Sequence, residues 1–313
     1  MSRVTARRPT RRITPAGVIT RPDTLAVEEP LEIRIDGSAL TVTMRTPGHD
    51  IDLVHGFLFS ENIIESADDI VSARYCAGAE DRGVLSEVPA SNPDTPGEPE
   101  GGSPRNHEGL SEVSESNTAR NTYNVLDVEL RHPVAVRPRG FVTNSSCGVC
   151  GTTALDQVRT RSRFPLPAGS PRIDAAVLAA LPDELRTRQA VFDATGGLHA
   201  AGLFTSDGRV LVVREDIGRH NAVDKVVGWA LREQCVPAHD TVLIVSGRTS
   251  FELVQKAVMA GIPILGAVSA PSSLAVDLAV DNGLTLAGFL RGGTMNIYSG
   301  AERLSLEGAA TGT

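Results

Sequence analysis

The feature that most constrains the fold of this 313-residue chain is a regular alternation of apolar runs and amphipathic segments near its C-terminal end. The apolar runs fall at 241–245, 262–268 and 284–289, and helical spacing is found at 219–231, 250–260 and 272–279. Short, continuously apolar strands separated by amphipathic helices are typical of an α/β layer with a largely parallel sheet. The pattern therefore predicts an α/β core in the C-terminal half.

The preceding sequence predicts a smaller, β-rich part. Apolar and polar residues alternate on both sides of the turn signal Asp36-Gly37, so we expect a β-hairpin over 31–44. Further expected elements are a helix over 50–59, strands over 70–76 and 123–130, helices over 174–181 and 184–192 separated by Pro182-Asp183, and a hairpin turning at 206–208. The expected fold class is α/β, with a mixed, largely parallel sheet in the C-terminal domain and a smaller N-terminal β-rich domain.

Two segments are expected to be disordered. Region 78–121 is full of Pro, Gly, Ser, Asn and Glu, so it cannot bury enough apolar surface to offset its ordering entropy. The first 21 residues contain six arginines and no acidic residue, namely Arg3, Arg7, Arg8, Arg11, Arg12 and Arg21. A basic chain start of this kind is usually solvated and disordered, so we expect the same here. The expected organisation is a disordered basic tail at 1–28, a β-rich domain at 29–140 with the insertion, an α/β domain at 141–304 and a tail at 305–313.

Composition argues against several classes of protein. The chain has a net charge of −8 and few aromatic residues, which disfavours nucleic-acid binding. No apolar run has the length of a membrane-spanning helix and no secretory signal is visible, so we expect a cytoplasmic protein without membrane contact. Four cysteines, of which Cys76 and Cys235 are isolated, fit a reducing compartment better than a disulfide scaffold.

The other two cysteines form a C-x-x-C pair, Cys147 and Cys150, flanked by Gly148 and Gly151. Glycines let the backbone turn tightly and leave the sulfurs uncovered, and a following helix N-terminus would lower the thiol pKa. The pair is thus a candidate reactive site. Half of a structural zinc site, or two small buried apolar residues, are the alternatives, although the sequence offers no second ligand pair at matching spacing.

Three loops are expected to follow the carboxyl ends of strands in the α/β core. They span 246–250, 268–272 and 289–294, and they contain hydroxyl groups, glycines, Arg248, Ser269 and Arg291. The carboxyl ends of strands in open α/β sheets are the usual ligand site, and helix N-termini there bind anions. These loops predict phosphate or pyrophosphate recognition, but no Walker A or G-x-G-x-x-G pattern accompanies them.

A polar cluster opens the helix expected over 219–231. His220 and Asp224 stand four residues apart on one helical face, and so do Asn221 and Lys225. The cluster fits two interpretations, the orientation of a ligand or proton donor, and ordinary pairing on a helix surface near its N-terminus.

Together these segments resemble the formate dehydrogenase accessory sulfurtransferase (FdhD) family. The resemblance rests on C-G-V-C-G at 147–151, G-R-H-N-A-V-D-K at 218–225, S-G-R-T-S-F-E-L-V-Q-K at 246–256, A-G-I-P-I-L-G-A-V-S-A-P-S-S-L-A-V at 260–276 and G-L-T-L-A-G-F-L-R-G at 283–292. It covers roughly residues 29–304, apart from the insertion. The resemblance implies a cytidine-deaminase-like fold for the C-terminal domain, and a homodimer.

The resemblance also implies a function. Such a protein accepts persulfide sulfur from a cysteine desulfurase and transfers it to the molybdenum bis-molybdopterin guanine dinucleotide cofactor required by formate dehydrogenase. It would be a sulfurtransferase that binds this cofactor as a substrate and needs no permanent metal. Cys147 would carry the persulfide, and Cys150 is the second expected catalytic residue. The expected cofactor-binding residues are Phe289, Leu290, Arg291, Gly292, Gly293 and Thr294 from the resemblance, with Arg248, Ser269 and His220 from the loops and the polar cluster.

Rival functions make different demands on the same residues. A zinc deaminase pairs P-C-x-x-C with an upstream H-x-E or C-x-E, but Ser146 replaces the proline here and no such upstream motif exists. A non-catalytic chaperone for the molybdenum cofactor would need the anion-binding loops but no reactive thiol. A C-x-x-C redox or zinc protein would need the cysteines but not the loops.

Overall fold

The structure is a computed structural model that describes residues 4–76, 124–134, 142–143 and 162–306. The insertion predicted at 78–121, the C-terminal tail beyond residue 306 and both cysteines of the C-x-x-C pair lie outside the described residues. The predictions for those segments therefore stay predictions.

The C-terminal half is built on a six-stranded sheet with the strand order β10-β9-β11-β12-β13-β14. The strands are β9 (His199–Thr205), β10 (Val210–Asp216), β11 (Thr241–Val245), β12 (Ile264–Ala267), β13 (Thr285–Arg291) and β14 (Thr294–Ser299). Only β11–β12 and β12–β13 pair in parallel, whereas the three remaining pairs are antiparallel. The sheet is mixed, but the expectation that it is largely parallel is wrong, because an antiparallel hairpin closes each of its edges.

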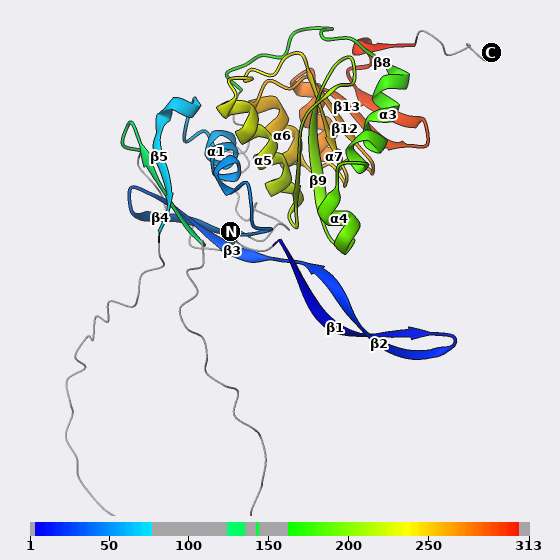
Figure 1. The fold of residues 1–313 in the computed structure, drawn as a ribbon. Helices are drawn as coiled ribbons and strands as arrows, with labels where there is room; N and C mark the ends of the chain where they lie inside the picture. The colour runs from blue at the N-terminus through cyan, green and yellow to red at the C-terminus, as the bar shows by residue number, and fades with distance from the viewer. Residues whose placement is uncertain (1–3, 77–123, 135–141, 144–161, 307–313) are drawn as a thin grey trace, which may run out of the picture.

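Helices cover both faces of this sheet (Figure 1). Helices α5 (Arg219–Arg232), α6 (Phe251–Met259) and α7 (Ser273–Asp281) lie on one face, and α3 (Ala175–Arg186) lies on the other. Strand residues alternate between them: Leu243 and Val245 pack with α5 to α7, and Val242 and Ile244 pack with α3. Burial on both faces explains the continuously apolar strands. None of the helices in the described part of the chain has the length and hydropathy of a membrane-spanning helix.

Helix α3 differs from its prediction, because it runs through Pro182 where two helices were expected to separate. The second expected helix shrinks to α4 (Ala190–Thr195). Pro182 donates no backbone hydrogen bond, which disfavours a helix interior. However, Leu178, Leu181 and Leu185 are buried against the sheet, and packing of an apolar face contributes more to helix stability than local propensity does.

The N-terminal part forms a five-stranded sheet with the order β5-β6-β3-β4-β7. Its strands are β3 (Glu29–Ile35), β4 (Ser38–Arg45), β5 (Ile70–Tyr75), β6 (Val125–Leu130) and β7 (Val142–Thr143), and the short helix η1 (Ala67–Asp69) precedes β5. In the C-terminal half, β8 (Ile173–Asp174) and β15 (Leu304–Ser305) form a separate two-stranded sheet, and the short helix η2 (Ala301–Arg303) precedes β15. The hairpin and both strands predicted for the N-terminal part are confirmed. Strand β7 was not predicted; it pairs in parallel with β4, and Thr143 lies opposite Thr43.

The basic start of the chain is ordered rather than disordered. Residues 5–26 form an antiparallel ribbon of β1 (Thr5–Thr14) and β2 (Gly17–Ala26), which projects from the body (Figure 1). The expectation of a disordered tail at 1–28 is therefore wrong for these residues. The β-branched residues of this segment favour strands, and Pro15-Ala16 forms the turn between them. This preference for a hairpin outweighs the effect of the arginine charges, which suggested a solvated tail.

The two parts of the chain meet where α1 (Asp50–Ser60) crosses α5. Two glycines let the helix backbones touch. A Cβ atom on Gly228 would lie 1.8 Å from the carbonyl oxygen of Asp52, and one on Gly56 would lie 1.9 Å from that of Asp224. The helices therefore cross at a distance that no larger residue permits.

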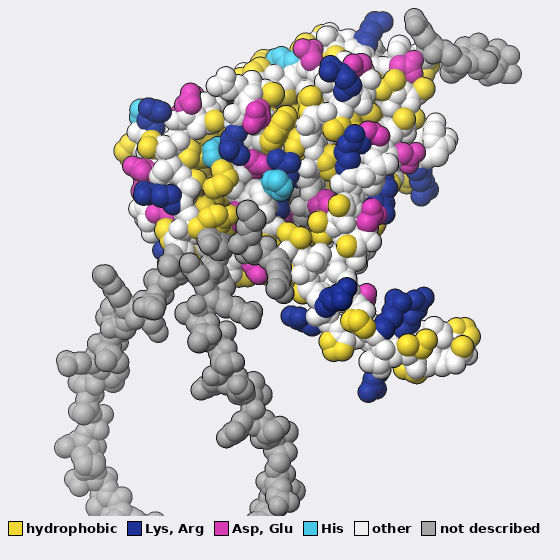
Figure 2. All heavy atoms as spheres, viewed as in Figure 1, with side chains coloured by type: hydrophobic (Ala, Val, Ile, Leu, Met, Phe, Trp, Pro, Cys, Tyr) yellow, Lys and Arg dark blue, Asp and Glu magenta, His cyan; other side chains and the backbone are white. Residues whose placement is uncertain are grey.

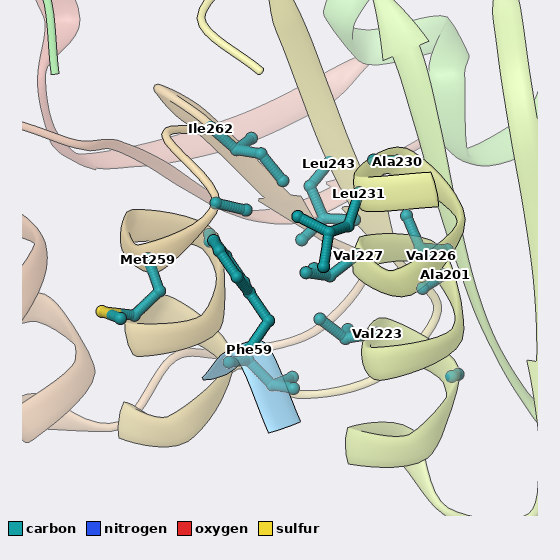
Figure 3. Packing of buried hydrophobic residues seen from close by; sticks show 14 of the residues in the cluster. Phe59, Ala201, Val223, Val226, Val227, Ala230, Leu231, Leu243, Met259 and Ile262 are labelled. Carbon is teal, nitrogen blue, oxygen red and sulfur yellow. The ribbon is translucent and has the colours of Figure 1, made fainter. Parts of the chain in front are cut away.

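A continuous apolar cluster surrounds this crossing. Figure 3 shows the Phe59 side chain of α1 between Met259 of α6 and Val223 of α5. The same cluster extends to Leu31 in the N-terminal sheet and to Leu286 in the C-terminal sheet. The two predicted domains thus share one core, so the N-terminal sheet depends on α5 for part of its burial.

The helix crossing makes a specific prediction for stability. Gly228→Ala should lower the free energy of unfolding by about 2–3 kcal/mol, because the new methyl group meets backbone atoms that cannot rotate away. The better helix propensity of alanine offsets only about 1 kcal/mol of this cost. Urea denaturation checks the value. The matched control is Gly197→Ala, since a Cβ atom there has no neighbour within 4 Å; equal stability of both variants would contradict the close crossing.

Candidate functional site

The three loops predicted to bind anions lie together at one edge of the C-terminal sheet. The Thr249 backbone N–H donates to the Ala270 carbonyl oxygen at 3.2 Å, and the Ser272 N–H donates to the Thr249 carbonyl oxygen at 3.0 Å. The third segment joins them through the Phe289 N–H, which donates to the Ser269 carbonyl oxygen at 3.2 Å. The order of strands β11, β12 and β13 produces this arrangement, because their carboxyl ends share an edge.

Segment 289–294 is not the simple loop that was expected. Strand β13 continues through Arg291, and β14 begins at Thr294. Gly292 and Gly293 have φ angles of 57° and 77°, and such paired positive values form the tight two-residue turn of a β-hairpin. The segment therefore divides into strand residues at the sheet edge and an exposed turn.

A cavity of about 570 Å³ opens beside these strand ends. Ser246, Val268 and Arg291 line it from the ends of β11, β12 and β13. Arg186 and Phe192, from α3 and α4, line the opposite wall. The volume lies within the usual range for small-molecule sites, and the lining combines apolar side chains with a few polar ones.

The cavity includes some of the predicted cofactor-binding residues and leaves others beside it. Leu290 and Arg291 line it. The remaining predicted residues do not line it, namely Phe289, Gly292, Gly293, Thr294, Arg248, Ser269 and His220. Of these, Phe289 and Ser269 are hydrogen-bonded to each other next to the cavity edge. Cys147 and Cys150 lie outside the described residues, so their position relative to the cavity stays a prediction.

His199, at the start of β9, is a cavity residue that the sequence did not reveal. Its ring lies against the loop after β11, and a Cβ atom on Gly247 would come within 3.2 Å of its Nδ1. Burial lowers the pKa of His199 below its ordinary value of 6.5, and the positive charge of Arg219 lowers it further. The imidazole is therefore neutral at neutral pH in a surrounding that already holds positive charge.

His220 lies at the N-terminus of α5, and it contacts the loop after β11. Its Nε2 is 2.7 Å from a carboxylate oxygen of Glu252 and 3.1 Å from the hydroxyl oxygen of Ser250. The hydrogen bond from His220 holds the pKa of the Glu252 carboxyl below its ordinary value. This imidazole therefore has a built-in carboxylate partner at the edge of the predicted site.

The rest of the polar cluster on α5 joins elements of the fold instead of facing a ligand. Lys225 Nζ is 2.7 Å from an Asp216 carboxylate oxygen and 2.9 Å from the Thr46 carbonyl oxygen, and its side chain is only 1% exposed. Asp224 is buried beside Lys256, whose Nζ lies 2.7 Å from it. Both buried pairs connect α5 to other elements, so the helix-surface interpretation is wrong for Asp224 and Lys225.

The wall formed by α3 and α4 was also missed from the sequence. The guanidinium of Arg186 lies 4.6 Å from the centre of the Phe192 ring, a cation–π contact between the two helices. The Glu215 carboxylate accepts hydrogen bonds from the Val191 and Phe192 backbone N–H groups and so fixes the start of α4. No sequence motif marks this wall, because its residues converge only through the contacts of α4 with Arg186 of α3 and with Glu215 of β10.

The described residues contain no group of three or more His, Cys, Asp or Glu side chains arranged to hold a metal ion. This finding does not extend to the C-x-x-C pair. The polar side chains that line the cavity are those of Asp183, Arg186, Gln189, His199, Ser246 and Arg291, and the two arginines among them are the groups that favour an anionic ligand.

Comparisons with known proteins agree on the relationship of this chain. A sulfur carrier protein FdhD of Nocardia farcinica (strain IFM 10152) is 65% identical over 311 residues, covering 99% of each chain. A sulfur carrier protein FdhD of Mycolicibacterium paratuberculosis (strain ATCC BAA-968 / K-10) is 52% identical over 305 residues, covering 96% of this chain and 99% of the relative.

A solved structure shows the same fold. It is the crystal structure of a Desulfotalea psychrophila protein assigned as a formate dehydrogenase accessory protein, with a TM-score of 0.67 and 20% identity. It covers 97% of this chain and 100% of that chain. The FdhD/NarQ family model matches residues 26–305, and this chain therefore belongs to the FdhD/NarQ family.

Proposed function

We propose that this protein is a sulfur carrier that accepts persulfide sulfur on Cys147 and transfers it to the molybdenum bis-molybdopterin guanine dinucleotide cofactor. The observation that carries the proposal is 65% identity, over nearly the whole of both chains, to a protein named as a sulfur carrier. The C-x-x-C pair supplies the thiol that such a role requires. Within this proposal the protein is a cytoplasmic sulfurtransferase, a cysteine desulfurase is the donor, formate dehydrogenase is the client, and the carrier works as a homodimer.

The strand that precedes the C-x-x-C pair in the sequence is linked to α5 through β4. Thr143 is the last residue of β7 and pairs with Thr43 of β4, whose hydroxyl group donates to the Asn221 side-chain oxygen at 3.3 Å. This contact connects the strand that precedes the C-x-x-C pair in the sequence to the N-terminus of α5, where His220 meets the loop after β11.

The transfer step follows thiol–disulfide chemistry. The Cys147 thiolate attacks the outer sulfur of the desulfurase persulfide and forms a new S–S bond with it. The bond between the two sulfurs of the donor breaks, and the donor cysteine leaves as a thiolate with the electron pair. The outer sulfur changes carrier without an external oxidant or reductant.

The cavity supports the second half of the proposal, which is the binding of the cofactor as a substrate. Its volume of about 570 Å³ suits one nucleotide moiety of the large bis-dinucleotide. Arg291 supplies positive charge for a pyrophosphate, whereas Arg186 is paired with Asp193 at 2.6 Å, and the apolar lining residues suit a base. Binding of that moiety would hold the molybdenum end at a fixed distance from the protein, so that transfer depends on proximity.

The proposal is tested by intact-mass measurement after incubation with a cysteine desulfurase and cysteine. The expected result is a gain of one sulfur atom that a thiol reductant removes. The rival function, a cofactor chaperone without sulfur chemistry, predicts that the mass stays constant while nucleotide binding is retained. Constant mass together with unimpaired support of formate dehydrogenase would rule out the sulfur-carrier function.

Nucleotide binding should depend on pH through His199. As pH falls through its lowered pKa, His199 gains a positive charge inside the cavity, so guanosine diphosphate should bind more tightly at an acidic pH below that pKa than at neutral pH. The phosphate also titrates in this range, so the informative quantity is the difference between the unaltered protein and His199→Gln in calorimetry.

Substitution of one arginine in the cavity, with a second arginine as the control, completes that test. Arg291→Ala should weaken binding about tenfold or more at both pH values, because it removes a charged partner from the cavity. Arg209→Ala, in the exposed turn between β9 and β10, is the matched control and should bind normally. Identical pH dependence of the unaltered protein and His199→Gln would show that the nucleotide does not approach His199.

A further inference from the structure

The ribbon of β1 and β2 is an arm with little support from its own chain. Its strands have ten residues each, so it extends about 33 Å. Near the tip, Ile13 is 81% exposed, Val18 is 63% exposed and Ile19 is 56% exposed. A two-stranded hairpin in water is at best marginally stable, and apolar tips at the end of an arm gain stability only when something covers them.

The arm differs sharply in charge from the rest of the protein. It carries five arginines and one acid, namely Arg7, Arg8, Arg11, Arg12, Arg21 and Asp23, for a net charge of +4. The whole chain has a net charge of −8, so the remainder carries −12. Figure 2 shows Lys and Arg side chains spaced along the arm, next to exposed hydrophobic side chains. The described residues outside the arm hold 26 acidic and 17 basic residues, a net charge of −9, so the arm is electrostatically complementary to a body like its own.

Two prolines determine how the arm can make contact. Pro9 and Pro22 lie opposite each other in the middle of the ribbon. Proline has no N–H to donate, so this pair interrupts both free edges and disfavours the addition of another strand along them. The arm therefore presents its two faces to a partner, with arginine and apolar side chains on each.

We infer that the β1–β2 arm docks on the acidic body of a second copy of this chain. In a two-fold symmetric pair each basic arm meets an acidic body, so one contact formed twice satisfies both arms. The inference specifies the contact that would hold the homodimer named in the proposed function. A nucleic acid would also attract the arm, but the net charge of −12 on the rest of the chain would repel it.

The base of the arm connects this interface to the candidate site. Strand β2 packs against α4, and Phe192 of α4 lines the cavity. An arm held by a second copy would therefore be fixed at the wall of the cavity. The contact of β2 with α4 gives dimer formation a physical route to the ligand site.

Sedimentation velocity over a range of concentrations tests the inference on the full chain. The unaltered protein should dimerise, and the triple variant Arg11→Glu, Arg12→Glu, Arg21→Glu should weaken the dimer at least about tenfold. Raising the salt from about 0.05 M to about 0.5 M should weaken only the dimer of the unaltered protein. Arg209→Glu reverses an exposed arginine on the body and should leave the dimer unchanged. A monomeric unaltered protein, or a triple variant that dimerises normally, would overturn the inference.

A second measurement identifies the partner directly. A photoreactive benzoylphenylalanine in place of Ile13, in a mixture of light and nitrogen-15-labelled protein, should give cross-linked peptides of mixed label. Cross-links within one copy only, or to RNA or another protein, would contradict docking on a second copy. Sulfur uptake on Cys147 is measured in the same samples. A protein that dimerises through the arm but takes up no sulfur would refute the proposed function alone, and the reverse result would refute only the arm.

Discussion

A Cys147→Ala variant will take up no sulfur from a cysteine desulfurase, whereas the unaltered protein will gain the mass of one sulfur atom. Loss is expected to be complete, because the thiolate of this residue is the nucleophile that forms the new S–S bond, and the second thiol of the motif, Cys150, is expected to act only after Cys147 is loaded. Support of formate dehydrogenase activity should be lost with it. Intact-mass spectrometry measures the first effect, and a formate dehydrogenase assay in cells that lack their own carrier measures the second.

The other cysteines provide graded controls for that experiment. Cys235→Ala should gain sulfur normally, because Cys235 follows α5, outside the C-x-x-C motif. Cys150→Ala should still gain sulfur if Cys150 acts only after loading, as a resolving or second carrier thiol. Sulfur uptake by Cys147→Ala at the level of the unaltered protein would refute the assignment of the carrier.

Lys225→Met should lower the free energy of unfolding by about 4 kcal/mol, the largest loss of stability expected from any single change discussed. Its Nζ lies 2.7 Å from Asp216, whose carboxylate also accepts hydrogen bonds from the Thr46 and Gly218 backbone N–H groups. Removing the lysine leaves this carboxylate buried without its counter-charge at the junction of β10, α5 and the segment after β4. Chemical denaturation followed by circular dichroism measures the loss.

A double variant separates the lost charge pair from lost packing. Asp216→Asn combined with Lys225→Met removes both charges and should recover at least half of the lost stability, since an uncharged amide costs less to bury than a carboxylate. Arg209→Ala removes an exposed cation paired with Asp207 and should leave the unfolding curve unchanged. A double variant less stable than Lys225→Met would mean that the lysine acts through something other than this pair.

The C-terminal core was predictable because each of its elements has a recognisable local sequence pattern. Strands buried on both faces appear as continuous apolar runs, and each helix between them has one apolar face. The predicted bounds therefore agree within one residue with strand Thr241–Val245 and helix Arg219–Arg232. The three loops at one sheet edge followed from the same pattern, because strand order fixes which loop ends are neighbours. Local pattern also predicted the hairpin around Asp36-Gly37.

Where local preference and packing disagree, the sequence pattern misleads. Pro182 suggested a helix end, yet three buried leucines keep α3 continuous. The arginines of the first 21 residues suggested disorder, yet residues 5–26 pair as a ribbon. In both cases the residue type does disfavour the observed structure. Its free-energy cost is smaller than the stabilisation from contacts that cannot be recognised in the sequence.

The sequence by itself determined the family, through its motif blocks, and it predicted a C-x-x-C pair as the reactive thiols and three loops as an anion site. Tertiary structure alone decided which polar residues face the cavity. His199, Arg186 and Arg291 come together there from separate elements. Lys225 and Asp224, which share a motif with His220, are instead buried in ion pairs that join α5 to β10 and α6. The physical reason is that burial and pairing depend on contacts between residues far apart in sequence, which helical spacing on a single element cannot encode.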